Sequence, residues 1–112
     1  MAATLPKEIP ASLLANSIPL EWGEVAWTRA DALQVVSALD GSSVAILGGD
    51  VLQKRERRFE HESSSWHSDR REDELWLDYA LRNWSETMAY LKRFPDPEDG
   101  SFAYVLVFKS SS

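Results

Sequence analysis

Four side chains in one short stretch could ligate a metal ion. They lie in the sequence HESSSWHSD and are His61, Glu62, His67 and Asp69, and imidazole and carboxylate groups are common zinc ligands. Their spacing matches no helical His-x-x-x-His pattern, and the serine-rich sequence between the histidines is typical of a surface loop. We therefore predict no metal, no cofactor and no catalytic residue, and an enzyme that uses His61, His67 and Asp69 is the least favoured interpretation.

A second stretch, VAILGGDVL, raises the question of whether its paired glycines bind a phosphate group. A P-loop needs Gly-x-x-x-x-Gly-Lys-Ser/Thr and a dinucleotide site needs Gly-x-Gly-x-x-Gly, and neither pattern occurs here. Apolar residues resume directly after Asp50, as they do in a strand that continues. Because glycine inside a strand marks a bulge or a sharp bend, we predict that Gly48 and Gly49 form a structural turn that presents Asp50.

The charge of the chain favours some partners over others. Its 112 residues include 12 Lys and Arg against 18 Asp and Glu, which gives a net charge of −6. Nucleic-acid-binding surfaces are usually basic, so we predict no nucleic-acid partner. An acidic protein is suited to a basic protein partner, although acidity also serves solubility alone.

Other features of the composition concern the compartment. Cysteine is absent, which excludes disulfides and thiol nucleophiles and is consistent with a reducing compartment. The sequence MAATLPKEIPASLL lacks the pattern of a signal peptide, and no apolar run reaches the roughly 20 residues of a membrane helix. We therefore predict a cytoplasmic protein that does not bind a membrane.

Apolar periodicity predicts three helices. A short helix is expected within residues 6–18, and a second over 28–39, with Thr28 as its N-cap and Gly41 as a left-handed residue after its end. A longer helix is expected over about residues 74–94, with Asp73 as its N-cap. Its predicted buried stripe consists of Leu77, Leu81, Trp84, Met88 and Leu91.

Three strands complete the predicted core. Residues 43–53 form an apolar run typical of a buried strand, residues 58–62 alternate as in a more exposed strand, and the basic sequence KRERR between them is expected in solvent. Residues 101–109 are apolar on both faces, which predicts a central strand. We expect an α+β fold, a small mixed or antiparallel sheet packed against two main helices, in one domain. That domain would comprise a variable segment 1–27, an α-β-β-α-β core 28–109 and a tail 110–112.

Several of the five tryptophans are candidates for partner binding, since tryptophan is enriched at binding hot spots. Trp66 lies in the polar sequence SSSWHSDRRED, which we expect to be a loop, and Trp76 follows it. A polar rim surrounds both in the sequence, as is typical of an interface residue, although extension of the core is the simpler interpretation.

The order of these motifs resembles the immunity protein 40 family, which occurs beside bacterial polymorphic toxins. The resemblance runs from about residue 32 to residue 108 through VAILGGDVL, SSWHSDR and YLKRFPDPEDGSFAYVLVF. The residues that match the family motif are Gly48, Gly49, Asp50, Trp66 and Asp69.

The resemblance implies an inhibitor that binds a cognate toxin protein and neutralises it. Many toxins of such systems are nucleases with basic clefts, so an acidic inhibitor could occlude such a surface by charge complementarity. The residues expected to contribute are Asp50, Trp66, Asp69, Glu72, Asp73, Glu74 and Trp76. The alternative is a small regulatory or ligand-binding domain with an aromatic pocket. The sequence leaves the identity of the toxin and the oligomeric state open.

Overall fold

The computed structural model describes residues 5–110, and at positions 62 and 63 it describes the backbone alone. Strands β3 (Ala45–Arg55), β4 (Arg58–His67) and β5 (Phe102–Lys109) form an antiparallel sheet in the order β4-β3-β5. Strands β1 (Ile18–Pro19) and β2 (Val25–Ala26) form a separate antiparallel ribbon. The helices are α1 (Ala11–Ala15), α2 (Arg29–Ala38) and α3 (Trp76–Arg93).

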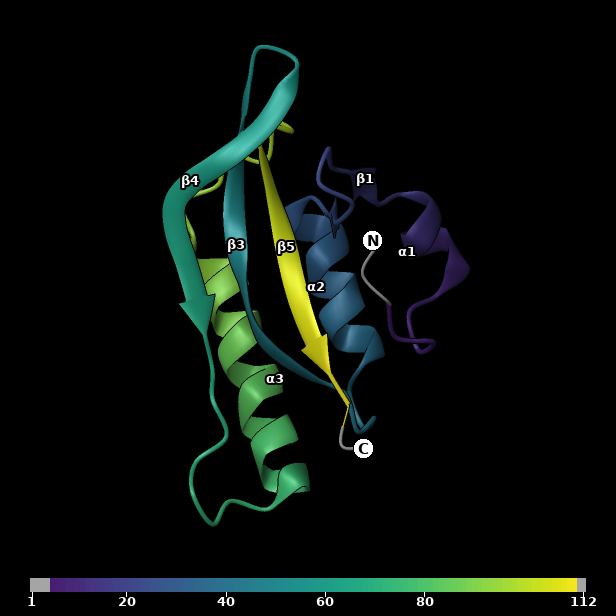
Figure 1. Ribbon diagram of the computed structural model, residues 1–112, viewed down its shortest axis with the longest axis vertical. Helices are drawn as coiled ribbons and strands as arrows, with labels where there is room; N and C mark the ends of the chain where they lie inside the picture. The colour runs from purple at the N-terminus through teal and green to yellow at the C-terminus, as the bar shows by residue number, and fades with distance from the viewer. Residues whose placement is uncertain (1–4, 111–112) are drawn as a thin grey trace.

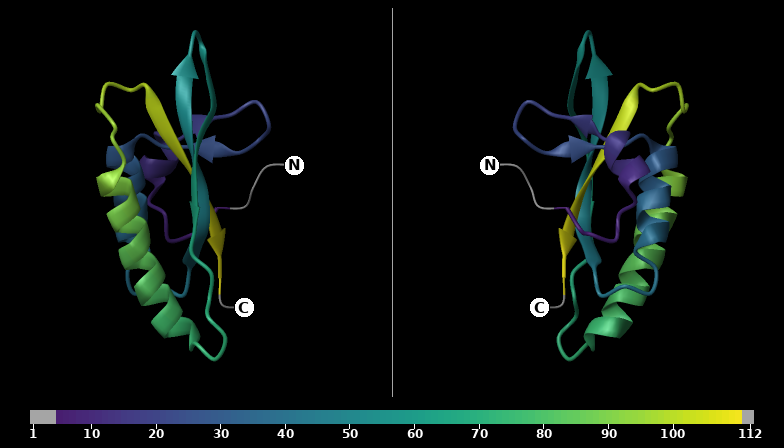
Figure 2. Two further views of the ribbon diagram at one scale, coloured as in Figure 1. Left: turned by 90° about the vertical axis from the view of Figure 1, so that its left-hand side faces the viewer. Right: turned by 90° about the vertical axis from the view of Figure 1, so that its right-hand side faces the viewer.

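The larger sheet separates two layers, as Figures 1 and 2 show: α2 and α3 cover one face, and the β1–β2 ribbon lies against the other. Buried side chains from the sheet and the helices form the main core, which includes Trp27, Val36, Val51, Leu91 and Tyr104. A smaller cluster under the ribbon contains Ala26, Leu52, Ala103 and Val105. The fold is therefore α+β with an antiparallel sheet and two main helices, as predicted.

Helix α2 begins where its capping residue was predicted. The Thr28 hydroxyl accepts a hydrogen bond from the Asp31 backbone amide at 3.5 Å, which satisfies one donor of the first turn. After the helix ends, Gly41 takes a positive φ of 81°, where glycine carries no Cβ penalty. The prediction for this helix is confirmed at both ends. The first helix is shorter than predicted, because its only α-helical turns are Ala11–Ala15.

Helix α3 starts later than predicted, and the prediction of Asp73 as its N-cap was wrong. Its N-cap is Leu75, whereas Asp73 lies in the preceding loop with a positive φ of 66°. Aspartate tolerates that left-handed conformation better than most residues, because its short polar side chain bonds locally. The acidic residues before the helix are therefore folded into a loop and are not the first helical turn.

The predicted buried stripe of α3 was wrong in its first half. Leu77 is 67% exposed and Leu81 is 63% exposed. The face that meets the sheet instead carries the buried residues Tyr79, Asn83, Thr87 and Leu91.

The length of α2 explains this difference. The two helices run antiparallel, since Arg29 at the start of α2 donates to the Phe94 carbonyl and Trp84 donates to the Val36 carbonyl. At 1.5 Å per residue, the 10 residues of α2 span about 15 Å and the 18 residues of α3 about 27 Å. The second half of the stripe packs beside α2, and the first half extends beyond its end, as Figure 1 shows.

The strands differ from the prediction in two respects. Strand β4 continues to His67, so Trp66 is part of the sheet and the polar loop begins only at Ser68. Strand β5 is an edge strand and β3 is central, so the prediction of a central final strand was wrong. Both faces of β5 are covered from Ala103 to Leu106, whereas Val107 is exposed. The outer edge of β5 pairs with Trp27 through the Tyr104 backbone at 3.0 and 2.8 Å.

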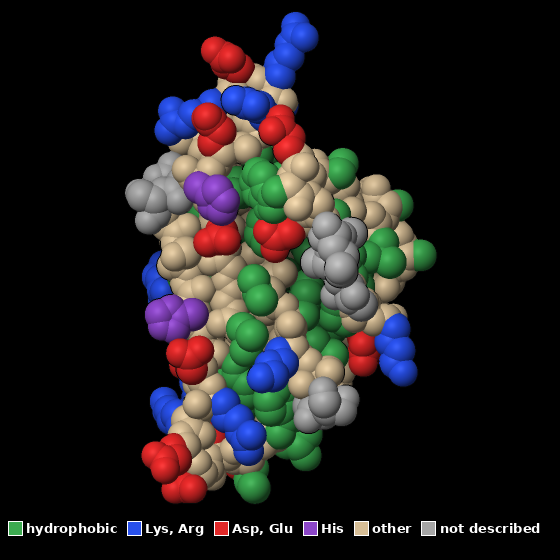
Figure 3. All heavy atoms as spheres, viewed as in Figure 1, with side chains coloured by type: hydrophobic (Ala, Val, Ile, Leu, Met, Phe, Trp, Pro, Cys, Tyr) green, Lys and Arg blue, Asp and Glu red, His purple; other side chains and the backbone are tan. Residues whose placement is uncertain are grey.

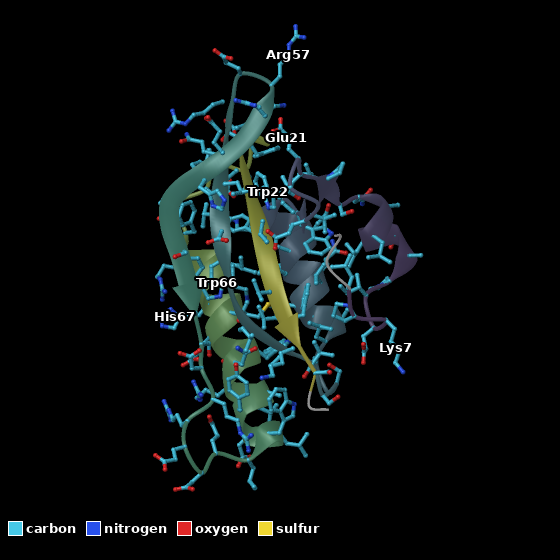
Figure 4. All side chains as sticks on the ribbon, viewed as in Figure 1. Lys7, Glu21, Trp22, Arg57, Trp66 and His67 are labelled. Carbon is cyan, nitrogen blue, oxygen red and sulfur yellow. The ribbon has the colours of Figure 1, made fainter. Side chains whose placement is uncertain are left out.

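The basic sequence KRERR forms the end of the β3–β4 hairpin. Residues 56 and 57 make the turn, and the side chains from Lys54 to Arg58 are exposed, as predicted. Figure 4 shows Arg57 pointing away from the tip. Among the helices of the described chain, none is long and apolar enough to span a membrane.

Candidate partner-binding surface

Gly48 and Gly49 allow three strands to approach one another closely. The β3–β5 register shifts between Ile46 and Gly48, so the predicted bulge is present. A methyl group on Gly48 would lie 2.2 Å from the Trp66 carbonyl oxygen. A methyl group on Gly49 would lie 2.1 Å from the Val105 carbonyl oxygen and 2.6 Å from the Trp66 indole. The glycines are therefore required because the neighbouring backbone and an indole ring occupy the space of a side chain.

Trp66 lies between the sheet and α3. Its ring covers Gly49 and stacks on Tyr90, with ring centroids 4.5 Å apart. Its indole Nε1 is buried and has no hydrogen-bond partner among the described residues. The residue therefore packs mainly within the protein, where it fixes α3 against the bulge, and Figure 4 shows it near α3, one residue before the exposed His67.

Trp76, the first residue of α3, also makes a structural contact. Its Nε1 donates to the Ser43 carbonyl at 2.7 Å, and its ring packs edge-on against Tyr79 at 5.3 Å. The Arg70 guanidinium lies over the same ring at 5.9 Å. These contacts join the start of α3 to the segment that leads into β3.

Asp50 lies on the face of the sheet opposite the helices. It pairs with Ser65 of β4 and Val105 of β5 and is half-buried. His67, two residues beyond Ser65, is exposed, and its Nε2 lies 3.9 Å from the Asp69 carboxylate. Figure 3 shows this face with charged side chains gathered toward both ends. Asp50 is therefore separated along the sheet from the acidic residues after β4.

Those acidic residues belong to the loop 68–75, which we call the acidic loop. Arg82 of α3 holds it: the guanidinium donates twice to the Glu74 carboxylate, at 2.9 and 2.7 Å, and once to the Asp69 carbonyl at 2.8 Å. The Arg71 backbone amide donates to the same carboxylate at 2.9 Å. Glu74 is consequently neutralised within the fold and positions the loop.

Three other acids of the loop remain directed to solvent. Asp69, Glu72 and Asp73 are exposed. Among the side chains that the structure describes, none forms an ion pair with Glu72 or Asp73. The structure thus brings Asp69, Glu72, Asp73, Glu74 and Trp76 to one end of the molecule and leaves Asp50 and Trp66 elsewhere.

The pairing of Glu74 with Arg82 predicts a dependence of stability on pH. Hydrogen bonds from Arg82 and from the Arg71 amide lower the pKa of Glu74 from 4.5 to about 2. A lowered pKa in the folded state stabilises the fold above the unfolded value, and this contribution is lost as the pH falls toward 2. We expect Glu74→Gln to unfold at lower urea than wild type at pH 7, and the difference to shrink between pH 4.5 and about pH 2.

Urea titrations across this pH range would measure the effect. Glu72→Gln is the matched control, because it removes an exposed carboxylate from the same loop. If the stability difference between Glu74→Gln and wild type stays constant from pH 7 to pH 2, the lowered pKa of Glu74 is contradicted.

The histidines do not assemble a site with the acids whose side chains the structure describes, and the side chain of Glu62 lies outside that part. His61 stacks on Trp22 with ring centroids 5.4 Å apart, on the part of the sheet near the ribbon, whereas His67 lies near Asp69. Within the described part of the chain, no group of at least three His, Asp or Glu side chains is arranged to hold a metal ion.

Sequence reasoning missed the residues of α3 that organise this surface. Arg82 and Glu86 are spaced four apart and form an ion pair at 2.9 Å, a signal that the helical pattern contained. Asn83 is 1% exposed, and an asparagine on the helix face that meets the sheet could have indicated a specific buried partner.

Comparison with known proteins identifies the family of the chain. A family model described as Immunity protein 40 matches residues 15–108 of the 112. The chain belongs to the Immunity protein 40 family. The match begins before residue 32 and so includes the β1–β2 ribbon with Trp22 and Trp27. No curated protein and no solved structure matches the chain.

Proposed function

We propose that the protein binds a cognate bacterial toxin and neutralises it, with the acidic loop facing a basic surface of that toxin. The observation that carries the proposal is membership of the Immunity protein 40 family across residues 15–108. The net charge of −6 supports a basic partner, since charge complementarity accelerates encounter and selects among partners.

The structure of the acidic loop supports this role. Arg82, Tyr79 and Glu86 of α3 bind the loop: Tyr79 donates to the Ser68 carbonyl at 2.5 Å, and Glu86 accepts from the Ser68 hydroxyl at 2.6 Å. A loop that is already ordered loses less conformational entropy on binding than a flexible one. Its exposed carboxylates would therefore meet a partner in a fixed arrangement.

The direct test is co-expression with the protein encoded immediately upstream of this gene. We expect that protein to arrest growth when expressed alone, and the two proteins together to restore growth and to co-purify. Absence of toxicity and of a complex would contradict the proposal and favour a small ligand-binding domain.

The role of the acidic loop has its own test. We expect Glu72→Gln/Asp73→Asn to slow association with that upstream protein by roughly tenfold at low ionic strength and to weaken the dependence of the rate on salt. The matched control, Glu56→Gln/Glu60→Gln, removes the same charge from exposed positions near the tip of the β3–β4 hairpin. Equal effects of the two double variants would show that only net charge matters.

A further inference from the structure

The first turns of α3 border an apolar groove that α2 does not reach. The groove has a volume of about 210 Å³ and lies between α3 and the connection from α2 to β3. Its apolar lining comprises Leu39, Val44, Leu77, Ala80, Leu81 and Trp84. With Leu77 and Leu81 each about two-thirds exposed, the groove presents a continuous apolar surface at the end of the helix.

The exposed leucines contribute little to the stability of the fold. Burial of apolar area stabilises in proportion to the area removed from water, and most of the surface of these two side chains stays in water. Two large apolar side chains one helical turn apart, beside a groove, are instead typical of a surface that another protein covers.

One acidic side chain lines this groove, and three others lie close to its lining residues along the chain. Asp40 lines it, Asp78 adjoins Leu77 on α3, and Glu72 and Asp73 lie on the loop that leads into the same helix end. All four are exposed and lack an ion pair with the residues described.

Two of the three arginines near these acids are engaged within the protein, whereas the exposed Arg71, next to Glu72, makes no ion pair with the described residues. Arg82 is bound to Glu74 and Glu86, and Arg70 donates to the Glu74 carbonyl at 2.6 Å and lies over the Trp76 ring. The groove therefore has an apolar floor and an acidic rim.

We propose that this groove is the apolar centre of the toxin interface and that it takes an apolar side chain or turn of the toxin that is flanked by lysine or arginine. This inference rests on the proposed function. An interface between proteins of this size buries about 800 Å² on each partner and combines an apolar centre with a polar rim. The groove supplies the centre, and the acidic loop with Asp40 and Asp78 supplies the rim.

Charge distinguishes this occupant from a second copy of the chain. A symmetric dimer through the groove would bring the acidic rims of two copies together, and like charges in contact oppose association. A basic-rimmed partner removes that repulsion, and the same acids then contribute attraction.

The test uses the complex with the protein encoded immediately upstream. We expect Leu77→Ala/Leu81→Ala to weaken binding at least roughly a hundredfold, about tenfold for each leucine at the centre of an interface, mainly through faster dissociation. Alanine is the best helix former, so the free variant should unfold at the same urea concentration as wild type. The matched control is Leu14→Ala, which truncates an exposed leucine on α1.

The outcomes separate the two proposals. Loss of affinity in the α3 variant with retention in Leu14→Ala supports the groove. Wild-type affinity in the α3 variant overturns the groove and leaves the proposed function standing. Failure of the wild-type protein to bind overturns the proposed function and the inference with it. Sedimentation of the free protein adds one further outcome: dimers that Leu77→Ala/Leu81→Ala abolishes would assign the groove to a second copy and overturn the inference.

Discussion

Replacing Gly49 with alanine should destabilise the fold by about 3 kcal/mol or more, a large share of the roughly 5–15 kcal/mol of a typical domain. The added methyl group would lie 2.1 Å from the Val105 carbonyl oxygen and 2.6 Å from the Trp66 ring. Relief requires β5 to move away from β3 and the Trp66 indole to leave Tyr90, and both changes disrupt the core. Urea unfolding followed by tryptophan fluorescence would measure the loss.

Gly41→Ala is the control that distinguishes the cost of a steric collision from the cost of an unfavourable backbone conformation. Gly41 has a positive φ of 81° and nothing within 4 Å of an added methyl group, so its replacement carries only the conformational cost of about 1–2 kcal/mol. We therefore expect Gly49→Ala to be clearly the worse of the two variants. Equal losses would mean that the strands have room to separate, and the close approach would not be the reason for glycine.

The second large effect is expected at Asn83, whose side chain completes the central strand. Its Oδ1 accepts from the Ile46 backbone amide at 2.7 Å, and its Nδ2 donates to the Ile46 carbonyl. The β3–β4 ladder begins only at Gly48, so a side chain from α3 satisfies the backbone that β4 does not reach. Asn83→Ala leaves both buried groups without partners, and at about 1–3 kcal/mol for each the expected loss is about 2–6 kcal/mol.

Two variants make this prediction specific. Asn83→Asp preserves the acceptor and removes the donor, so it should also destabilise the fold. Ser85→Ala, at an exposed position of the same helix, should change the free energy of unfolding by less than about 0.5 kcal/mol. If Asn83→Ala unfolds at the same urea concentration as wild type, Ile46 must be satisfied in another way, for example by water.

The sequence predicted those elements whose signals are local. The α2 helix has a capping threonine and a glycine after its end, and β3 is a continuous apolar run interrupted by glycine, so each is specified by adjacent residues. The α3 stripe was wrong in part because the burial of Leu77 and Leu81 depends on where another helix ends. Strand order was wrong for β5 because a covered edge strand and a central strand have the same apolar pattern.

The candidate surface was predictable in charge and not in geometry. The run of acids after β4 predicts an acidic loop, and Glu72 and Asp73 are exposed there. The sequence did not show that Glu74 is neutralised, because its partner Arg82 lies eight positions later, on α3. Strand β4 extends beyond the alternating residues 58–62 and places Trp66 against Tyr90. The sequence did not indicate this extension, because the serines before Trp66 have little preference for strands.

The pairing of β3 with β5 has a consequence for how the protein is synthesised. Residues 45–55 are translated well before residues 102–109, and the central strand lacks one neighbour until the later segment has left the ribosome. During that interval one edge of β3 is open to pairing with other chains. The backbone of Trp27 also lacks its partner, because it pairs with Tyr104 of β5. The three-stranded sheet can therefore close only after β5 has left the ribosome, so the fold is completed late in synthesis.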